Sequence, residues 1–252
     1  MTDLPTFRLD GRRALVTGAG RGIGRAIALG YAAAGAEVTL CARSQEELNA
    51  LSEEIRASGG TCDVMPLDIT DQAAVTAALA DREAYHILLN NAGTNRPKPL
   101  TEVVDEDIDA VLDLNVRATI LMTRAVVSRM LEDAVTGSVI TMSSQMGHVG
   151  AANRTLYCAS KWAVEGFTRA LAVELGPQGI RVNTICPTFI ETPLTAPFFE
   201  DPAFKEQVLS KIKLGRIGQP SDIVGAAVFL ASDASALMTG SSVMLDGGWT
   251  AD

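Results

Sequence analysis

Short, almost purely apolar runs recur along the chain, and segments with the apolar spacing of helices separate them. The runs are residues 14–17, 38–41, 64–67, 87–89, 139–142, 182–185 and 243–245. Strands that are apolar throughout and alternate with helices are typical of a parallel sheet covered on both faces. The pattern therefore predicts an α/β fold, a single doubly wound, Rossmann-like domain with a seven-stranded parallel sheet.

The segment after the second run shows helical spacing most clearly. Ser44 and Glu47 have the spacing of a capping box, and Leu48, Leu51 and Ile55 then recur on one face. We expect a helix that begins near Ser44.

No internal repeat or low-complexity linker divides the chain. Its 252 residues, 47% of them apolar, can bury one sizeable core, so residues 1–252 are predicted to form a single domain. The irregular stretch 187–202 holds four prolines and three phenylalanines. We expect a mobile substrate loop over about 187–213, with an apolar interface segment as the alternative.

The net charge and the cysteines indicate which binding partners and which cellular compartment to expect. Lys and Arg number 21 against 30 Asp and Glu, a net charge of −9, which disfavours binding to nucleic acid or to anionic membranes. We see no secretory leader and no apolar run of about 18 residues. The four cysteines, Cys41, Cys62, Cys158 and Cys186, are widely spaced. Free thiols, a cytoplasmic protein and no metal site are therefore expected.

Glycines cluster directly after the first predicted strand, in Thr17-Gly18-Ala19-Gly20-Arg21-Gly22-Ile23-Gly24. Ile23 breaks the general G-x-G-x-x-G fingerprint, and the spacing is G-x-x-x-G-x-G instead. Between a strand and a helix, such glycines let backbone N–H groups approach a pyrophosphate at the positive end of the helix. The turn therefore predicts a dinucleotide site.

The end of the second strand indicates which dinucleotide binds. NAD-binding folds carry an acidic residue there for the ribose 2′-OH, but this chain has Cys41-Ala42-Arg43. Arg43 can bind a 2′-phosphate, and Arg21 can add a second cation, although both could also be solvated surface charges. NADP(H) is preferred, with NAD(H) as the alternative. Asp68 could accept from the adenine amino group or cap the helix after Thr70.

Tyr157 and Lys161 are one helical turn apart, so their side chains can share a face. Alcohol oxidation needs a group that removes the hydroxyl proton, and the Lys161 cation should favour the phenolate of Tyr157. Ser144 follows the strand 139–142 at the sheet edge where ligands bind, with Ser143 as a rival. Asn115 lies inside the predicted helical stretch 103–130, where asparagine is a poor residue without a specific partner.

Together these residues resemble the short-chain dehydrogenase/reductase family, from about Gly11 to Trp249. The motifs that carry the resemblance are Thr17-Gly18 with Gly22 and Gly24, Asn90-Asn91-Ala92-Gly93, Ser144 with Gly147, Tyr157 with Lys161, Asn115, Thr239-Gly240 and Asp246-Gly247-Gly248. The resemblance implies an NAD(P)-dependent oxidoreductase that interconverts a secondary alcohol and a ketone by hydride transfer. Tyr157 would be its acid and base.

The resemblance also assigns roles to single residues. It selects Ser144 over Ser143, and it implies that Asn115 anchors a water in a proton relay through Lys161. It places Asn91 toward the adenosine, and Ile190 and Thr192 at the nicotinamide carboxamide. The full set implied for the cofactor is Gly18, Gly20, Arg21, Gly22, Ile23, Arg43, Asp68, Ile69, Asn91, Ala92, Gly93, Tyr157, Lys161, Pro187, Ile190 and Thr192. A homotetramer is also implied.

Polar residues near the expected pocket indicate the small-molecule substrate. They are Asn95, Arg96, Gln145, His148, Asn153, Arg154 and Thr188, the last standing where the family usually has glycine. Such groups suit a polyol, a sugar or a sugar acid whose anion pairs with Arg154 or Arg96. Each could instead be structural: a solvated loop residue, an ion pair or a turn.

Two other functions remain open. The chain also resembles reductases of 3-oxoacyl groups on a carrier protein, but it is acidic overall, and Gln178 stands where those enzymes typically have an arginine. A non-catalytic nucleotide-sensing protein is the second alternative. Such a protein would be expected to lose Tyr157 or Lys161, and both are present.

Overall fold

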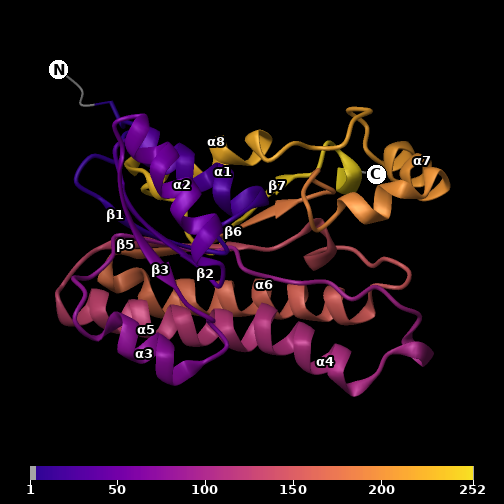
Figure 1. The fold of residues 1–252 in the computed structure, drawn as a ribbon, viewed down its shortest axis with the longest axis horizontal. Coiled ribbons are helices and arrows are strands. Elements are labelled where there is room, and N and C mark those ends of the chain that lie inside the picture. Colours follow the sequence, from indigo (N-terminus) through magenta and orange to yellow (C-terminus); the bar gives the residue numbers. More distant parts are fainter. Residues whose placement is uncertain (1–3, 252) are drawn as a thin grey trace.

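The computed structural model describes residues 4–251 and contains one seven-stranded sheet (Figure 1). Its strands are β1 (Arg13–Thr17), β2 (Glu37–Ala42), β3 (Thr61–Pro66), β4 (Ile87–Asn90), β5 (Gly137–Met142), β6 (Ile180–Pro187) and β7 (Ser242–Leu245). All neighbouring strands are parallel, in the order β3-β2-β1-β4-β5-β6-β7. The predicted fold class is therefore confirmed.

The helices lie on both faces of the sheet (Figure 1). One face is covered by α1 (Gly22–Ala33), α2 (Gln45–Ala57) and α8 (Ser221–Ala231). The other is covered by α3 (Gln72–Ala80), α4 (Asp105–Leu112), α5 (Thr119–Glu132) and α6 (Thr155–Leu175). In β1, Ala14 and Val16 belong to the first core and Leu15 to the second, because successive side chains of a strand point to opposite faces.

Capping and apolar spacing explain why α2 begins where the sequence predicts. Ser44 is its N-cap, and the Ser44 hydroxyl accepts from the backbone N–H of Glu47 at 3.3 Å. Leu48, Leu51 and Ile55 are fully buried in the first core.

One predicted boundary is wrong, and the expected substrate loop is partly helical. The third strand covers 61–66 rather than 64–67, because polar Thr61 and Asp63 open it at the edge of the sheet. The segment 187–213 is not an irregular loop throughout. It contains a short 3₁₀ helix, Ala196–Glu200, and α7, Pro202–Lys211, which Asp201 caps by accepting from the N–H of Ala203.

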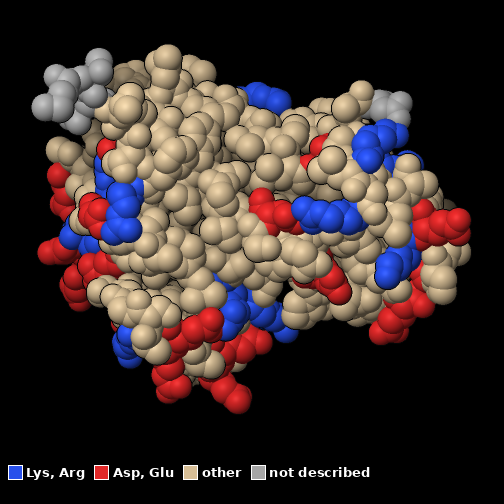
Figure 2. Space-filling model, turned by 90° about the horizontal axis from the view of Figure 1, so that it is seen from above, with Lys and Arg blue, Asp and Glu red and all other residues tan. Residues whose placement is uncertain are grey.

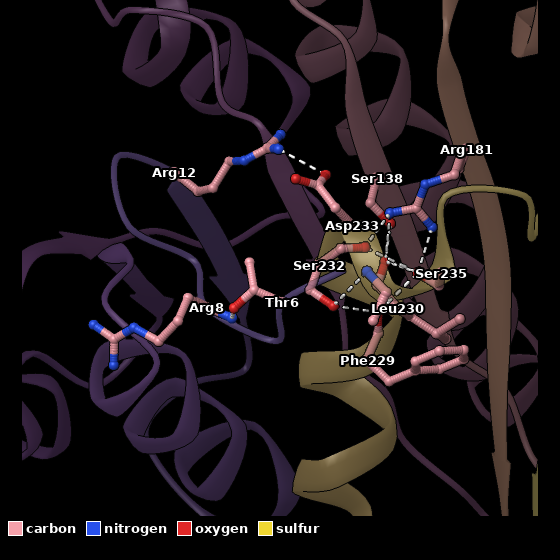
Figure 3. A network of polar contacts seen from close by, with 11 residues as sticks. Thr6, Arg8, Arg12, Ser138, Arg181, Phe229, Leu230, Ser232, Asp233 and Ser235 are labelled. Atoms are coloured by element: carbon pink, nitrogen blue, oxygen red, sulfur yellow. Dashed lines mark hydrogen bonds and ion pairs between the residues drawn. The ribbon is translucent and has the colours of Figure 1, made fainter. Parts of the chain in front are cut away.

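Arg181, near the amino end of β6, binds the carboxyl end of α8 (Figure 3). Its guanidinium donates to the carbonyl oxygens of Leu230 and Ser232 at 2.8 and 3.2 Å, and to the Ser235 hydroxyl at 2.9 Å. The last carbonyls of a helix lack partners within the helix, so a cation is well placed there. This network holds α8 to the sheet on the side away from the strand ends that carry the candidate site.

None of the described helices is long and apolar enough to span a membrane.

Candidate active site

Tyr157 and Lys161 lie in the first two turns of α6, beside the carboxyl end of β5. Lys161 Nζ lies 5.5 Å from the centroid of the Tyr157 ring. It also donates to the carbonyl oxygen of Met142, the last residue of β5, at 2.8 Å. Helix and strand end are thus joined through Lys161, and the predicted pair shares one site.

Burial dominates the electrostatics of this pair. It raises the pKa of Tyr157 to about 12, although a hydrogen bond with Ser144 and the charge of Arg154 lower it. Burial lowers the pKa of Lys161 to about 8, while the charges of Cys186 and Glu165 raise it. We expected Lys161 to favour the phenolate. That effect of Lys161 stays a prediction; the charge of Arg154 lowers the pKa of Tyr157, and at neutral pH the phenol is protonated.

Ser144 and Ser143 differ in their hydrogen bonds. Ser144 caps the 3₁₀ turn η3 (Gln145–Gly147) by accepting from the N–H of Met146 at 3.1 Å, and it hydrogen-bonds Tyr157. The buried Ser143 hydroxyl has no hydrogen-bond partner among the described residues. The structure therefore supports Ser144 as the serine that faces a substrate oxygen beside the phenol.

Asn115 lies in a π-helical segment, Asp113–Ala118, that separates α4 from α5. Its buried amide accepts from the N–H of Thr94 at 2.8 Å and donates to the Thr94 carbonyl at 2.9 Å and the Ser160 hydroxyl at 3.1 Å. These bonds fix the loop after β4 to the residue before Lys161. Asn115 is thus a positioning residue through its side chain, and the uninterrupted helix predicted over 103–130 is wrong at this point.

The glycines after β1 allow a close backbone packing that larger side chains would prevent. Gly18 has φ +66°, and a Cβ on it would lie 2.9 Å from the Cα of Ala92. A Cβ on Gly24 would lie 2.3 Å from the carbonyl oxygen of Gly18. The Asn91 amide donates to the carbonyls of Thr17 and Gly18 at 3.0 and 3.2 Å, so it holds this turn.

The start of α1 is open to an anion. The helix begins at Gly22, and its N-cap residue, Arg21, makes no side-chain cap. Ile23 lies in the first turn of this helix. On the loop after β4, a Cβ added to Gly93 would lie 3.2 Å from Asn115 Oδ1. Free N–H groups at a helix start, beside a backbone without side chains, fit the pyrophosphate of a dinucleotide.

The residues near the expected adenosine end fit a 2′-phosphate. Arg43 is exposed just after β2, and Arg21 is 3.9 Å from Glu47 Oε1. Asp68 Oδ1 accepts from the N–H and hydroxyl of Thr70, while Asp71 caps α3. The interpretation of Asp68 as the cap of that helix is therefore wrong. The neighbouring Ile69 is buried.

The segment after β6 brings the predicted nicotinamide residues to the glycine turn. Ile190 forms a parallel bridge with Gly218, and a Cβ on Gly22 would lie 3.4 Å from Thr192 Cγ2. Thr188, after Pro187, donates its N–H to Leu245 and is not among the residues with positive φ. Its replacement of glycine thus costs no backbone strain. Among the described residues its buried hydroxyl has no partner.

Besides Thr188, three of the predicted substrate residues carry buried polar atoms that lack a hydrogen-bond partner in the described part of the chain. They are Asn95 Oδ1, Gln145 Oε1 and Arg154 Nε. The Arg154 guanidinium lies 5.2 and 5.9 Å from the ring centroids of Phe198 and Phe204, which belong to the segment 187–213. Burial lowers the pKa of Arg154, and its charge acts on Tyr157.

The three remaining predicted substrate residues, Arg96, Asn153 and His148, contact other protein groups. Arg96 pairs with the buried Asp107 at 3.1 Å. Asn153 is an exposed turn residue with φ 58°, and its carbonyl accepts from the N–H of Lys98. His148 Nε2 lies 3.4 Å from Cys186 Sγ. Their role toward the substrate stays a prediction.

Sequence reasoning missed two groups around the site. Glu165 lies one helical turn after Lys161 and raises its pKa, and this i, i+4 spacing was visible in the sequence. Aromatic side chains cluster over the segment after β6, and Phe189 lies 5.6–6.0 Å from Phe199, Phe204 and Trp249 between ring centroids. From the sequence, only the three phenylalanines within 187–202 were noted, and their contacts with Phe204 and Trp249 were not expected.

Comparisons with known proteins agree with this arrangement. The family model described as enoyl-(acyl carrier protein) reductase matches residues 18–250. A D-threitol dehydrogenase of Mycolicibacterium smegmatis is 41% identical over 97% of this chain and 95% of its own length. A 3-oxoacyl-(acyl-carrier-protein) reductase of Thermotoga maritima is 38% identical over 96% and 99%. The structure of a gluconate 5-dehydrogenase from Burkholderia cenocepacia, in complex with NADP and tartrate, has 35% identity, a TM-score of 0.94 and 98% coverage of both chains.

Proposed function

The chain belongs to the short-chain dehydrogenase/reductase family, and from this premise we propose that it is an NADP(H)-preferring oxidoreductase for a polyol, sugar or sugar acid. Family members of this kind interconvert an alcohol and a ketone. The observation that carries the proposal is the convergence of Tyr157, Lys161 and Ser144 beside the carboxyl end of β5, next to a glycine turn that fits a dinucleotide.

The residues of the site divide the chemistry among them. The bound dinucleotide supplies or accepts the hydride. Ser144 holds the substrate oxygen, and the protonated phenol of Tyr157 donates to that oxygen in reduction and takes the proton back in oxidation. Lys161, with a pKa of about 8, can exchange a proton near neutral pH. Asn115 positions the start of this part of α6 through Ser160.

Arg43 supports the preference for NADP(H). It is exposed after β2, and no carboxylate stands at the end of that strand to repel a 2′-phosphate. Its charge also lowers the pKa of Asp68.

Arg154 supports a substrate with several oxygens or a carboxylate. It is nearly buried, it has an unpaired Nε among the described residues, and its charge reaches Tyr157. A buried guanidinium with a free donor is satisfied by an anionic or hydroxylated ligand. Asn95 and Gln145 offer two further unpaired oxygens for substrate hydroxyls.

The test is a panel of polyols, aldoses, aldonates, simple secondary alcohols and 3-oxoacyl esters, with turnover followed by nicotinamide absorbance. We expect turnover with hydroxylated substrates, and Arg154→Leu should lower kcat/KM for an aldonate by about tenfold or more. Arg96→Leu is the matched control and should leave this ratio nearly unchanged. Equal losses in both variants, or turnover restricted to apolar alcohols, would contradict the substrate assignment.

A 3-oxoacyl-carrier-protein reductase is the second candidate, because one relative has that activity. Acidic carrier proteins dock on basic patches. On the face that carries α1, α2 and α8, Lys and Arg are scattered among acidic residues rather than gathered in one basic patch (Figure 2). Turnover of 3-oxoacyl esters alone would favour this candidate. A non-catalytic nucleotide sensor would turn over nothing in the panel.

We further propose a cytoplasmic homotetramer. The four cysteines are free thiols, as a reducing compartment favours. Large apolar side chains are exposed on helices α4, α5 and α6, and they are Leu112, Ile120, Leu131, Trp162 and Val173. Apolar surface of this kind is typical of an interface between subunits. Sedimentation velocity of the purified protein tests this, and a monomer would contradict it.

A further inference from the structure

Three side chains that can bind a metal meet beside the catalytic pair, although they are far apart in the sequence. His148 follows η3, Glu165 lies on α6, and Cys186 lies in β6. Glu165 and Cys186 are buried, while the His148 side chain is 25% exposed. The sequence predicted no metal site, because the spacing of these residues matches no metal-binding motif.

The three possible ligand atoms form a nearly regular triangle. Cys186 Sγ lies 3.3 Å from Glu165 Oε1 and 3.4 Å from His148 Nε2, and the last two atoms are 3.6 Å apart. A tetrahedral ion with metal–sulfur distances of about 2.3 Å and metal–nitrogen or metal–oxygen distances of about 2.0–2.2 Å holds its ligand atoms about 3.3–3.6 Å apart. The side chains already have this spacing.

The surroundings orient one of the ligands, the Glu165 carboxylate. The Glu165 carboxylate is buried, and its Oε1 accepts from the Cys186 thiol at 3.3 Å. The Ser242 hydroxyl donates to Glu165 Oε2 at 2.6 Å and leaves Oε1 toward the cluster. Hydrogen bonds that orient a ligand in this way strengthen metal binding. The Cys186 thiol must give its proton to solvent when a metal–sulfur bond forms.

We propose that His148, Glu165 and Cys186 form a binding site for a divalent transition metal ion, with a solvent molecule as fourth ligand. A thiolate, an imidazole and a carboxylate are the donor set of tetrahedral Zn²⁺ and Co²⁺ sites. Solvent reaches the cluster at the exposed side of His148. The site is distinct from the proposed hydride transfer, but the Glu165 carboxylate lies one helical turn after the Lys161 ammonium on α6. A bound dication should therefore lower turnover reversibly.

The direct test is a Co²⁺ titration of the full-length, reduced protein, followed by absorbance. We expect visible bands of tetrahedral cobalt and a thiolate-to-cobalt charge-transfer band that saturate at one equivalent. Cys186→Ser should abolish the charge-transfer band, and Glu165→Gln should weaken binding by about tenfold or more. Cys158→Ser is the matched control, because Cys158 is a half-buried thiol outside the cluster, and it should keep both bands.

Circular dichroism shows whether each variant is folded, and His148→Ala provides a second test at the exposed edge of the cluster. It should lose the tetrahedral bands even if Cys186→Ser fails to fold. Absence of the charge-transfer band in the wild-type protein, or its persistence in both Cys186→Ser and His148→Ala, would overturn the proposal. This readout needs no turnover, so its failure leaves the proposed oxidoreductase activity standing.

Discussion

At the scale of single residues, the buried ammonium of Lys161 makes stability depend on pH. Its pKa falls from 10.5 to about 8 on folding because burial disfavours the charge. Between these values the unfolded chain binds the proton and the folded chain does not. Stability from this residue therefore rises as pH increases from about 8 to about 10.5.

A Lys161→Met variant removes this contribution. It should be more stable than the wild-type protein at pH 7, and the difference should shrink as pH rises toward 10.5. Urea unfolding at several pH values measures this. A difference that stays constant over this range would show that Lys161 is not the group that titrates.

The exposed arginines near α2 govern the choice of cofactor in this account. Arg43→Asp should shift the ratio of kcat/KM values from NADP(H) toward NAD(H) by tenfold or more, on the order of 1.4 kcal/mol, because it removes a phosphate partner and offers a ribose acceptor. Arg21→Asp should have a smaller effect, because Arg21 lies near Glu47. Steady-state kinetics with both cofactors measures this ratio. If the ratio of kcat/KM values is unchanged in Arg43→Asp, the Arg43 side chain does not contact the cofactor.

At the scale of elements, Arg181 holds the end of α8 to the sheet (Figure 3). Arg181→Ala leaves buried carbonyls and Ser235 without a charged donor, which should cost about 2–3 kcal/mol of stability. Arg12→Ala, which removes only an ion pair with the exposed Asp233, should cost less than about 1 kcal/mol. Urea unfolding of both variants gives the comparison. Equal losses would show that the Arg181 network does not stabilise α8.

The sequence predicted those elements whose local pattern agrees with their final surroundings. The strands of the sheet centre and α2 are of this kind, because burial and capping both act within a few residues. The π-helical turn at Asn115 was not predictable, since the helical apolar spacing continues through it. The helix α7 was not predicted, because the prolines and phenylalanines around it gave no helical spacing. The start of β3 was not predicted, because Thr61 and Asp63 are polar.

The same division holds for the candidate site. Tyr157 and Lys161 were predictable, because one helix turn brings them together, whereas the strand end left Ser143 as a rival that only the family resemblance set aside in favour of Ser144. The surroundings of Arg96 and His148 were not, because their partners, Asp107 and Glu165, come from other helices. The pKa of Tyr157 also depends on burial, which local spacing does not reveal.

At the scale of the whole molecule, the strand order brings the carboxyl ends of β1, β4, β5 and β6 to one edge of the sheet. The glycine turn, Asn91, Ser144 and Pro187 follow these ends, so cofactor and substrate residues meet at the reversal of strand order between β1 and β4. The Arg181 network lies at the opposite edge. The carboxyl ends of the strands thus hold the candidate catalytic and cofactor residues, and the amino ends hold the contacts that stabilise the packing of α8.

The central claim is that Tyr157 transfers the proton in an NADP(H)-dependent reaction. The most direct measurement compares wild-type protein and Tyr157→Phe for turnover of a hydroxylated substrate and for NADPH binding by fluorescence. The variant should lose turnover by a factor of about 10² or more and bind NADPH nearly as well, because only the proton-transfer group is removed. Retained turnover would contradict the claim, and so would a comparable loss of NADPH affinity.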